Sequence, residues 1–125
     1  MIDVYTLIPP MIEDIVRVEP QFPDTVAKFP DTVAKFPLGI LTPLDGGSGD
    51  IISGEERYAL VMFQLDVYDT ELQRCSEAAL AISRRLISRG FVRNSGGAIR
   101  ENRLHRRTMT FSAKIDEHTG LIYRR

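Results

Sequence analysis

Alternating hydrophobic and polar residues predict two long strands. From Arg57 to Tyr68 every second residue is apolar, and the residues between them are apolar at first and then polar. From Leu104 to Ile115 apolar residues again alternate with polar ones. Successive side chains of a strand point to opposite faces, so one face of each strand is expected to pack on a core. The apolar start of the first strand predicts that its first half is covered on both faces.

Apolar residues at helical spacing predict a helix near the start of the chain. Its apolar face would carry Ile8, Met11, Ile12, Ile15 and Val16. Prolines suit a first helical turn, so this helix is expected to run from Pro9 to Val18. Residues 2–8 would form a separate helical turn or an arm.

A second, longer helix is predicted after the first long strand. Thr70 and Gln73 have the spacing of a capping box, in which each side chain bonds a backbone N–H. Gly90 would end the helix in a left-handed conformation, with Phe91 folded back on it. The apolar stripe of this helix is expected to consist of Leu72, Cys75, Ala79, Ile82 and Leu86.

Short apolar runs predict the remaining strands. They lie at Leu38–Leu41, Phe91–Asn94 and Leu121–Tyr123, with Ala98–Arg103 as strand or loop and turns at Gly96-Gly97 and residues 116–120. Hairpin connections dominate this order. The predicted fold class is therefore α+β, a mostly antiparallel sheet of about four strands with two helices packed on one face. The length of 125 residues fits a single domain, 1–125.

An exact repeat interrupts this pattern. Residues 22–28 (FPDTVAK) are repeated as residues 29–35, and Phe36-Pro37 begins a third copy. A proline every seven residues is incompatible with a continuous helix or a central strand. We interpret residues 22–37 as a duplicated heptad in a loop, with a repeated docking motif as the alternative.

Charge is unevenly distributed along the chain. Residues 1–83 hold 5 basic and 14 acidic side chains, whereas residues 84–125 hold 11 basic and 3 acidic ones, which gives a net charge of −1. Two readings are open. Copies of the chain would bind head to tail through unlike charges, or the charges would interleave in space and cancel.

The sequence gives weaker signals for the cellular compartment of the protein and for catalytic or metal-binding residues. A single cysteine, no apolar run of membrane length and no signal-peptide pattern favour the cytoplasm. Cys75 is expected to be a buried, inert thiol. His105 and His118 lack further ligands at metal spacing, and Asp116, Glu117 and His118 fit a turn better than an acid–base cluster. No enzyme activity, cofactor or metal is predicted.

A basic stretch is the strongest candidate for binding. It contains Arg100, Arg103, Arg106 and Arg107, and the acidic residues that would oppose it in a subunit or partner interface are Asp45, Asp50, Glu55 and Glu56. Nucleic-acid binding through residues 100–107 is an alternative. A pI of about 6.1 and the lack of interleaved aromatic residues favour a protein contact instead.

The order of several short segments resembles a known family. Residues 63–68 (FQLDVY), 90–93 (GFVR), 106–113 (RRTMTFSA) and 120–124 (GLIYR) follow one another as in the tail-terminator, tail-completion or tail-to-head joining proteins of bacteriophages and prophages. The resemblance covers residues 57–125 well and residues 1–56 in layout. The duplicated heptad is not part of the family pattern.

This resemblance implies a structural role without an active site. Such subunits form a homo-oligomeric ring, typically a hexamer, at the head-proximal end of the tail tube in the virion, after assembly in the host cytoplasm. The ring ends tube polymerisation and joins tail to head, so the implied partners are other copies, the tail tube protein and the head–tail connector. No membrane is implied, and DNA would pass nearby without specific binding. Another neck, head-completion or tail tube component remains an alternative.

Overall fold

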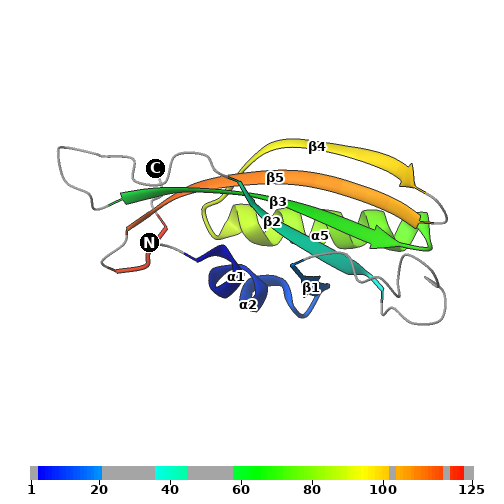
Figure 1. The fold of residues 1–125 in the computed structure, drawn as a ribbon, viewed down its shortest axis with the longest axis horizontal. Coiled ribbons are helices and arrows are strands. Elements are labelled where there is room, and N and C mark those ends of the chain that lie inside the picture. Colours follow the sequence, from blue (N-terminus) through cyan, green and yellow to red (C-terminus); the bar gives the residue numbers. More distant parts are fainter. Residues whose placement is uncertain (1–2, 21–35, 45–57, 102–103, 117–118, 123–125) are drawn as a thin grey trace.

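One five-stranded sheet organises the protein (Figure 1). The computed structural model describes residues 3–20, 36–44, 58–101, 104–116 and 119–122, without the side chains at 58, 95 and 99–101. The elements are α1 (Val4–Leu7), α2 (Pro9–Ile12), β1 (Arg17–Glu19), β2 (Leu38–Leu44), β3 (Tyr58–Asp69), α5 (Leu72–Ser88), β4 (Val92–Glu101) and β5 (Leu104–Asp116).

The sheet has the order β1-β2-β3-β5-β4. The β1–β2 pair is parallel, and the other three pairs are antiparallel. The α+β class and the mostly antiparallel sheet are therefore confirmed. The expected count of about four strands is too low for the described residues, because Arg17–Glu19 forms an additional edge strand.

The main core lies between the sheet and the helices. Apolar side chains of α1, α2 and α5 pack with alternate residues of β3 and β5 in one cluster. At its centre Phe63 lies opposite Phe111, with ring centroids 5.5 Å apart, and meets the edge of Phe91 at the same distance. This packing confirms helices on one face, although of the three helices in the described residues only α5 is longer than a single turn.

The predicted helix from Pro9 to Val18 is wrong in its second half. α2 ends at Ile12, and Arg17–Glu19 is a strand whose first N–H donates to the carbonyl of Pro37 at 3.2 Å. Ile12 and Val16 are both buried. Apolar spacing indicates which residues are buried, so it did not reveal that the helix ends at Ile12 and that a strand follows. The helical turn expected within residues 2–8 is confirmed as α1, which is capped by Asp3.

The two faces of β3 differ from expectation. Val61, Phe63, Leu65 and Val67 are buried against the helices as predicted. On the opposite face Leu60 and Met62 are only half-buried. The cover on that face lies over the second half of β3 instead, where Phe36 and Tyr68 pack on a small cluster of Leu38, Ile40 and Leu104.

The start of α5 also departs from the sequence prediction. The N-cap is Glu71, and it makes no side-chain capping bond. The Glu71 N–H donates to the buried carboxylate of Asp69 at 3.0 Å, and the Gln73 amide donates to Glu77 rather than to the backbone. The predicted capping box is wrong because the carboxylate of Asp69, at the end of β3, accepts the backbone N–H bond at the start of the helix.

The end of α5 is as predicted. Gly90 has a φ of 105°. The N–H of Gly90 donates to the carbonyl of Ile87, and the N–H of Phe91 donates to the carbonyl of Leu86. These two bonds form a Schellman motif, in which a left-handed residue lets the chain satisfy the last carbonyls of the helix. The motif directs buried Phe91 back into the core.

Two further expectations at the C-terminal end need correction. Gly96-Gly97 is not a turn, because β4 continues through it with a register shift between Arg93 and Ser95. The guanidinium of exposed Arg93 lies over Gly96, in the space that a Cβ would occupy. The closing strand Leu121–Tyr123 is reduced, in its described part, to a bridge between Ile122 and Ile115. The heptads of residues 22–35 lie outside the described residues.

Candidate interaction surfaces

Most of the interface residues predicted from charge fall outside the described residues. This holds for Asp45, Asp50, Glu55, Glu56 and Arg103. Arg100 lies in β4, paired with His105 of β5, without a described side chain. Arg106 and Arg107 are therefore the members of the predicted patch whose contacts are known.

Arg106 and Arg107 point to opposite faces of the sheet. Arg106 donates from Nε to Asp66 at 3.2 Å, and its guanidinium lies 5.8 Å from the centre of the Tyr68 ring. Arg107 lies on the helix side, where it donates to the Ser76 hydroxyl at 2.9 Å. Both are half-buried. The expectation of one solvent-rich basic patch is wrong for these two residues, because neighbours in a strand alternate between faces.

Several charges of the two halves of the chain do interleave. Arg106 pairs with Asp66, and Arg85 of α5 binds Asp14 through two bonds of 3.0 and 3.1 Å while also donating to the carbonyl of Met11. The bonds from Arg85 hold the pKa of the Asp14 carboxyl below its ordinary value. The bonds of Arg85 fasten α2 and the residues after it to α5, the Arg106 pair joins β5 to β3, and both neutralise part of the charge asymmetry.

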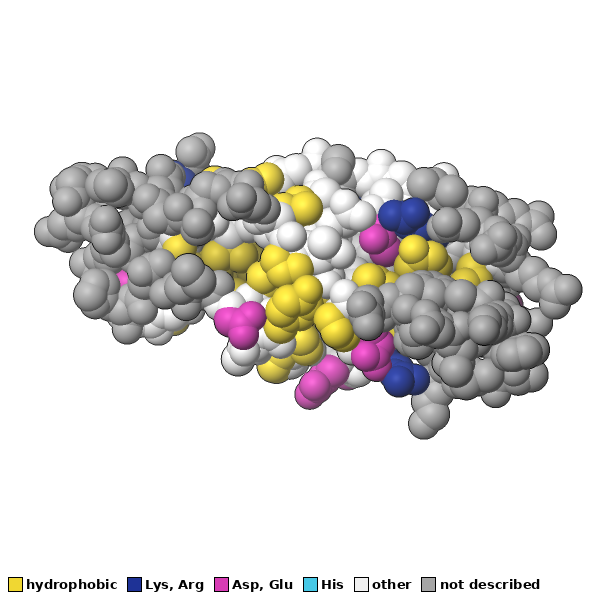
Figure 2. Space-filling model, in the orientation of Figure 1, with side chains coloured by type: hydrophobic (Ala, Val, Ile, Leu, Met, Phe, Trp, Pro, Cys, Tyr) yellow, Lys and Arg dark blue, Asp and Glu magenta, His cyan; other side chains and the backbone are white. Residues whose placement is uncertain are grey.

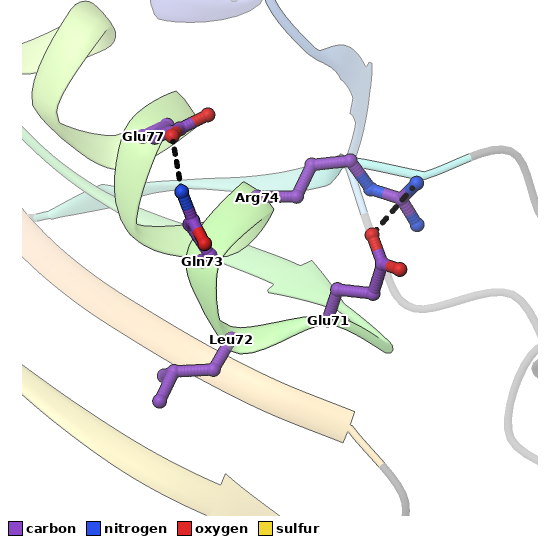
Figure 3. A pocket seen from close by; sticks show the side chains of 5 residues that line it. All are labelled: Glu71, Leu72, Gln73, Arg74 and Glu77. Atoms are coloured by element: carbon purple, nitrogen blue, oxygen red, sulfur yellow. Dashed lines mark hydrogen bonds and ion pairs between the residues drawn. The ribbon is translucent and has the colours of Figure 1, made fainter.

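A shallow pocket of about 570 Å³ lies at the start of α5 (Figure 3). Its lining side chains bond one another: Gln73 donates to Glu77, and Arg74 lies 3.2 Å from Glu71. Arg74 also holds the buried Asp69 with two bonds of 2.6 and 2.7 Å. The polar groups here stabilise the helix start, and we assign no chemistry to the pocket.

Cys75 is fully buried, as the sequence predicts. Its thiol donates to the carbonyl of Val67 at 3.2 Å and lies 3.6 Å from that of His105. Burial raises the pKa of the thiol, so it stays protonated and unreactive. Among the described residues, no group of three or more His, Cys, Asp or Glu side chains could hold a metal ion.

An exposed apolar stripe on α5 is the feature that sequence reasoning missed. Leu72, Leu80 and Ile87 are 54%, 49% and 52% exposed, and they follow one line along the helix with Ser76 and Ser83 between them. Leu72 had been assigned to the buried stripe, which is wrong. A second apolar line at helical spacing, offset from the first, was the available signal.

This stripe faces β4. Arg85 on one flank of α5 binds α2, while Ser76 on the opposite flank meets Arg107 of β5. Figure 3 shows Leu72 pointing toward β5 and β4. The exposed small residues Gly96 and Ala98 share this side of β4, since they pair with Met109 and Arg107. We call the surface formed by Leu72, Leu80, Ile87, Gly96 and Ala98 the α5–β4 face.

The two sides of the molecule differ in charge. Residues 78–100 contain five arginines and no acidic residue, and Arg84, Arg89 and Arg93 are exposed. On the other side, residues 3–20 contain four acidic residues and one arginine. We call α1, α2 and β1 the acidic edge, with Asp3, Tyr5, Glu13, Asp14 and Glu19 as its defining residues. Figure 2 shows acidic side chains beside hydrophobic ones over these elements.

Comparison with known families finds no family model that matches the chain. No curated protein is significantly similar to it in sequence. Within the part of the chain that the structure describes, no helix is both long and apolar enough to cross a membrane.

Proposed function

We propose that the protein is a structural subunit of a phage tail, which forms a homo-oligomeric ring at the head-proximal end of the tail tube. In this role it ends tube polymerisation and joins the tail to the head connector. Its partners are other copies of itself, the tail tube protein and the connector, and it resides in the virion. The resemblance of residues 57–125 to tail-terminator proteins supports this proposal.

The observation that carries the proposal is the pair of unlike surfaces on the two flanks of α5. The exposed stripe of α5 is apolar, with Arg84 beside it and Arg93 on the adjoining β4, whereas the acidic edge carries the opposite charge. Two different, complementary patches are what a head-to-tail contact requires, and such contacts close into rings when the rotation between copies permits. The described polar clusters bond internally, which suits a structural role.

The deciding experiment combines solution mass with a capping assay. Static light scattering across a range of concentrations, with negative-stain images, is expected to reveal closed rings of about six copies. Added to purified tail tubes of the encoding phage, the protein is expected to bind one tube end and stop elongation. Tubes that elongate normally and carry no added protein at either end would overturn the proposal.

A further inference from the structure

We infer that the acidic edge of one copy docks on the α5–β4 face of the next copy. This inference deepens the ring function proposed above and rests on it, because it names the two surfaces that meet. It concerns α1, α2 and β1 on one flank of α5 and the α5–β4 face on its other flank; the helices share one face of the sheet, and β1 and β4 are its two edges (Figure 1).

The apolar contribution comes from the stripe on α5. Three large side chains, each about half exposed, lie along one side of a helix whose buried stripe is already occupied by the core. From Leu72 to Ile87 the stripe is about 22 Å long at 1.5 Å per residue, so it fits within a standard interface of about 800 Å² per partner. Tyr5, 45% exposed, gives the acidic edge an aromatic side chain for this contact.

Charge decides which surface of the second copy fits. Arg84 neighbours Leu80 and Ile87 on α5, Arg93 lies on the helix side of β4 and both are exposed, whereas Arg85 is already engaged by Asp14. Two α5–β4 faces brought together with their Arg84 ends in contact would oppose arginine to arginine, which disfavours that arrangement. Asp3 and Glu13 on the acidic edge are exposed and have the complementary sign. The contact is therefore head to tail.

A phosphate-rich partner would fit this surface less well. Duplex DNA would satisfy the arginines, but it would leave Leu80 and Ile87 against charged backbone and water. The acidic edge provides carboxylates that can pair with the arginines, and it also provides apolar surface that can pack on the stripe of α5. For this reason we assign the face to a second copy of the chain.

Two blocked variants test the direction of the contact. Variant A, Leu80→Glu plus Ile87→Glu, removes the α5–β4 face, and variant B, Tyr5→Ser plus Glu13→Arg, removes the acidic edge. All four side chains are exposed, so unfolding curves in urea are expected to match the wild type. Leu121→Glu, at a 69% exposed apolar residue outside both surfaces, is the matched control.

Light scattering of each variant and of their mixture gives the readout. Each variant alone is expected to be monomeric, with association weakened at least about tenfold, whereas an equimolar mixture forms one heterodimer that grows no further. The Leu121→Glu control assembles like the wild type. The heterodimer is specific to a head-to-tail contact, because only the intact edge of A and the intact face of B remain.

Other outcomes overturn the inference in distinguishable ways. Association of B alone would show that the α5–β4 face binds itself, and association of A alone would show that this face is not used. A wild-type monomer at every concentration would reject this contact in free protein, and the tube-capping assay would still decide the proposed function. Binding of the monomer to duplex DNA or to anionic vesicles, lost in variant A, would assign the face to that partner instead.

Discussion

Cys75 shows how burial alone sets the chemistry of a side chain. The thiol is enclosed between α5 and the β3–β5 pair, and its hydrogen is donated to the carbonyl of Val67. Helical spacing predicted this burial, since Cys75 shares a stripe with Ile82 and Leu86. The role of Asp69 was not predictable in the same way, because it serves α5 from the end of the preceding strand, outside the capping pattern.

The raised pKa of Cys75 predicts a loss of stability at alkaline pH. The folded thiol keeps its proton while the unfolded thiol ionises near its ordinary pKa of about 8.5, so the stabilisation is present below that pH and is lost as pH rises. Between about pH 8 and pH 10, the unfolding free energy of wild type is expected to fall faster than that of Cys75→Ala, by up to about 1.4 kcal/mol per pH unit. Urea unfolding at several pH values measures this difference, and parallel curves would contradict it.

At the scale of elements, a glycine can end a helix or lie within a continuous strand, and the sequence did not separate the two cases. Gly90 ends α5 with a positive φ and was recognised from its place after the apolar stripe. Gly96 and Gly97 were mistaken for a turn, because the pattern of neighbouring residues gives no sign that Arg93 lies across Gly96. Similarly, β1 was missed because its pairing with β2 joins residues far apart in the sequence, whereas apolar spacing reports local contacts.

Two glycine substitutions separate these roles. Gly90→Ala is expected to lower the unfolding free energy by about 1–2 kcal/mol, because an L side chain is strained at φ 105°. Gly97→Ala is the matched control, since a Cβ there would lie 3.8 Å from the Thr108 methyl group in ordinary contact, and stability is expected to be unchanged or higher by up to about 1 kcal/mol. Urea unfolding of both variants provides the measurement. Equal losses in the two proteins would show that Gly90 has no special conformational role.

For the whole molecule, the sequence predicted the class of fold better than the surfaces. The alternation in β3 and β5 is strong because both strands bury one face, and it identified the central pair. The exposed patch around Arg106 and Arg107 was wrong, since register sends them to opposite faces and each finds a partner. The α5–β4 face depends on what the rest of the fold leaves uncovered, and a linear pattern does not contain that information.

Salt is expected to weaken assembly without abolishing it. Raising NaCl from about 0.1 M to about 1 M shortens the Debye length from about 10 Å to about 3 Å, which screens the arginines of one copy from the acidic edge of the next. The dissociation constant measured by sedimentation should rise about five- to tenfold, while the apolar stripe keeps a residual association. Assembly that strengthens with salt would indicate a purely apolar contact.

The irregular margins of the sheet also bear on how the protein behaves when concentrated. β4 is broken by its register shift at Arg93, and β2 extends past β1 into a segment that contains Pro43, which has no N–H to donate. Both features interrupt the row of backbone groups along these margins, which makes each a poorer template for a further strand. Growth of the concentrated protein into amyloid-like fibres through these two margins is therefore disfavoured.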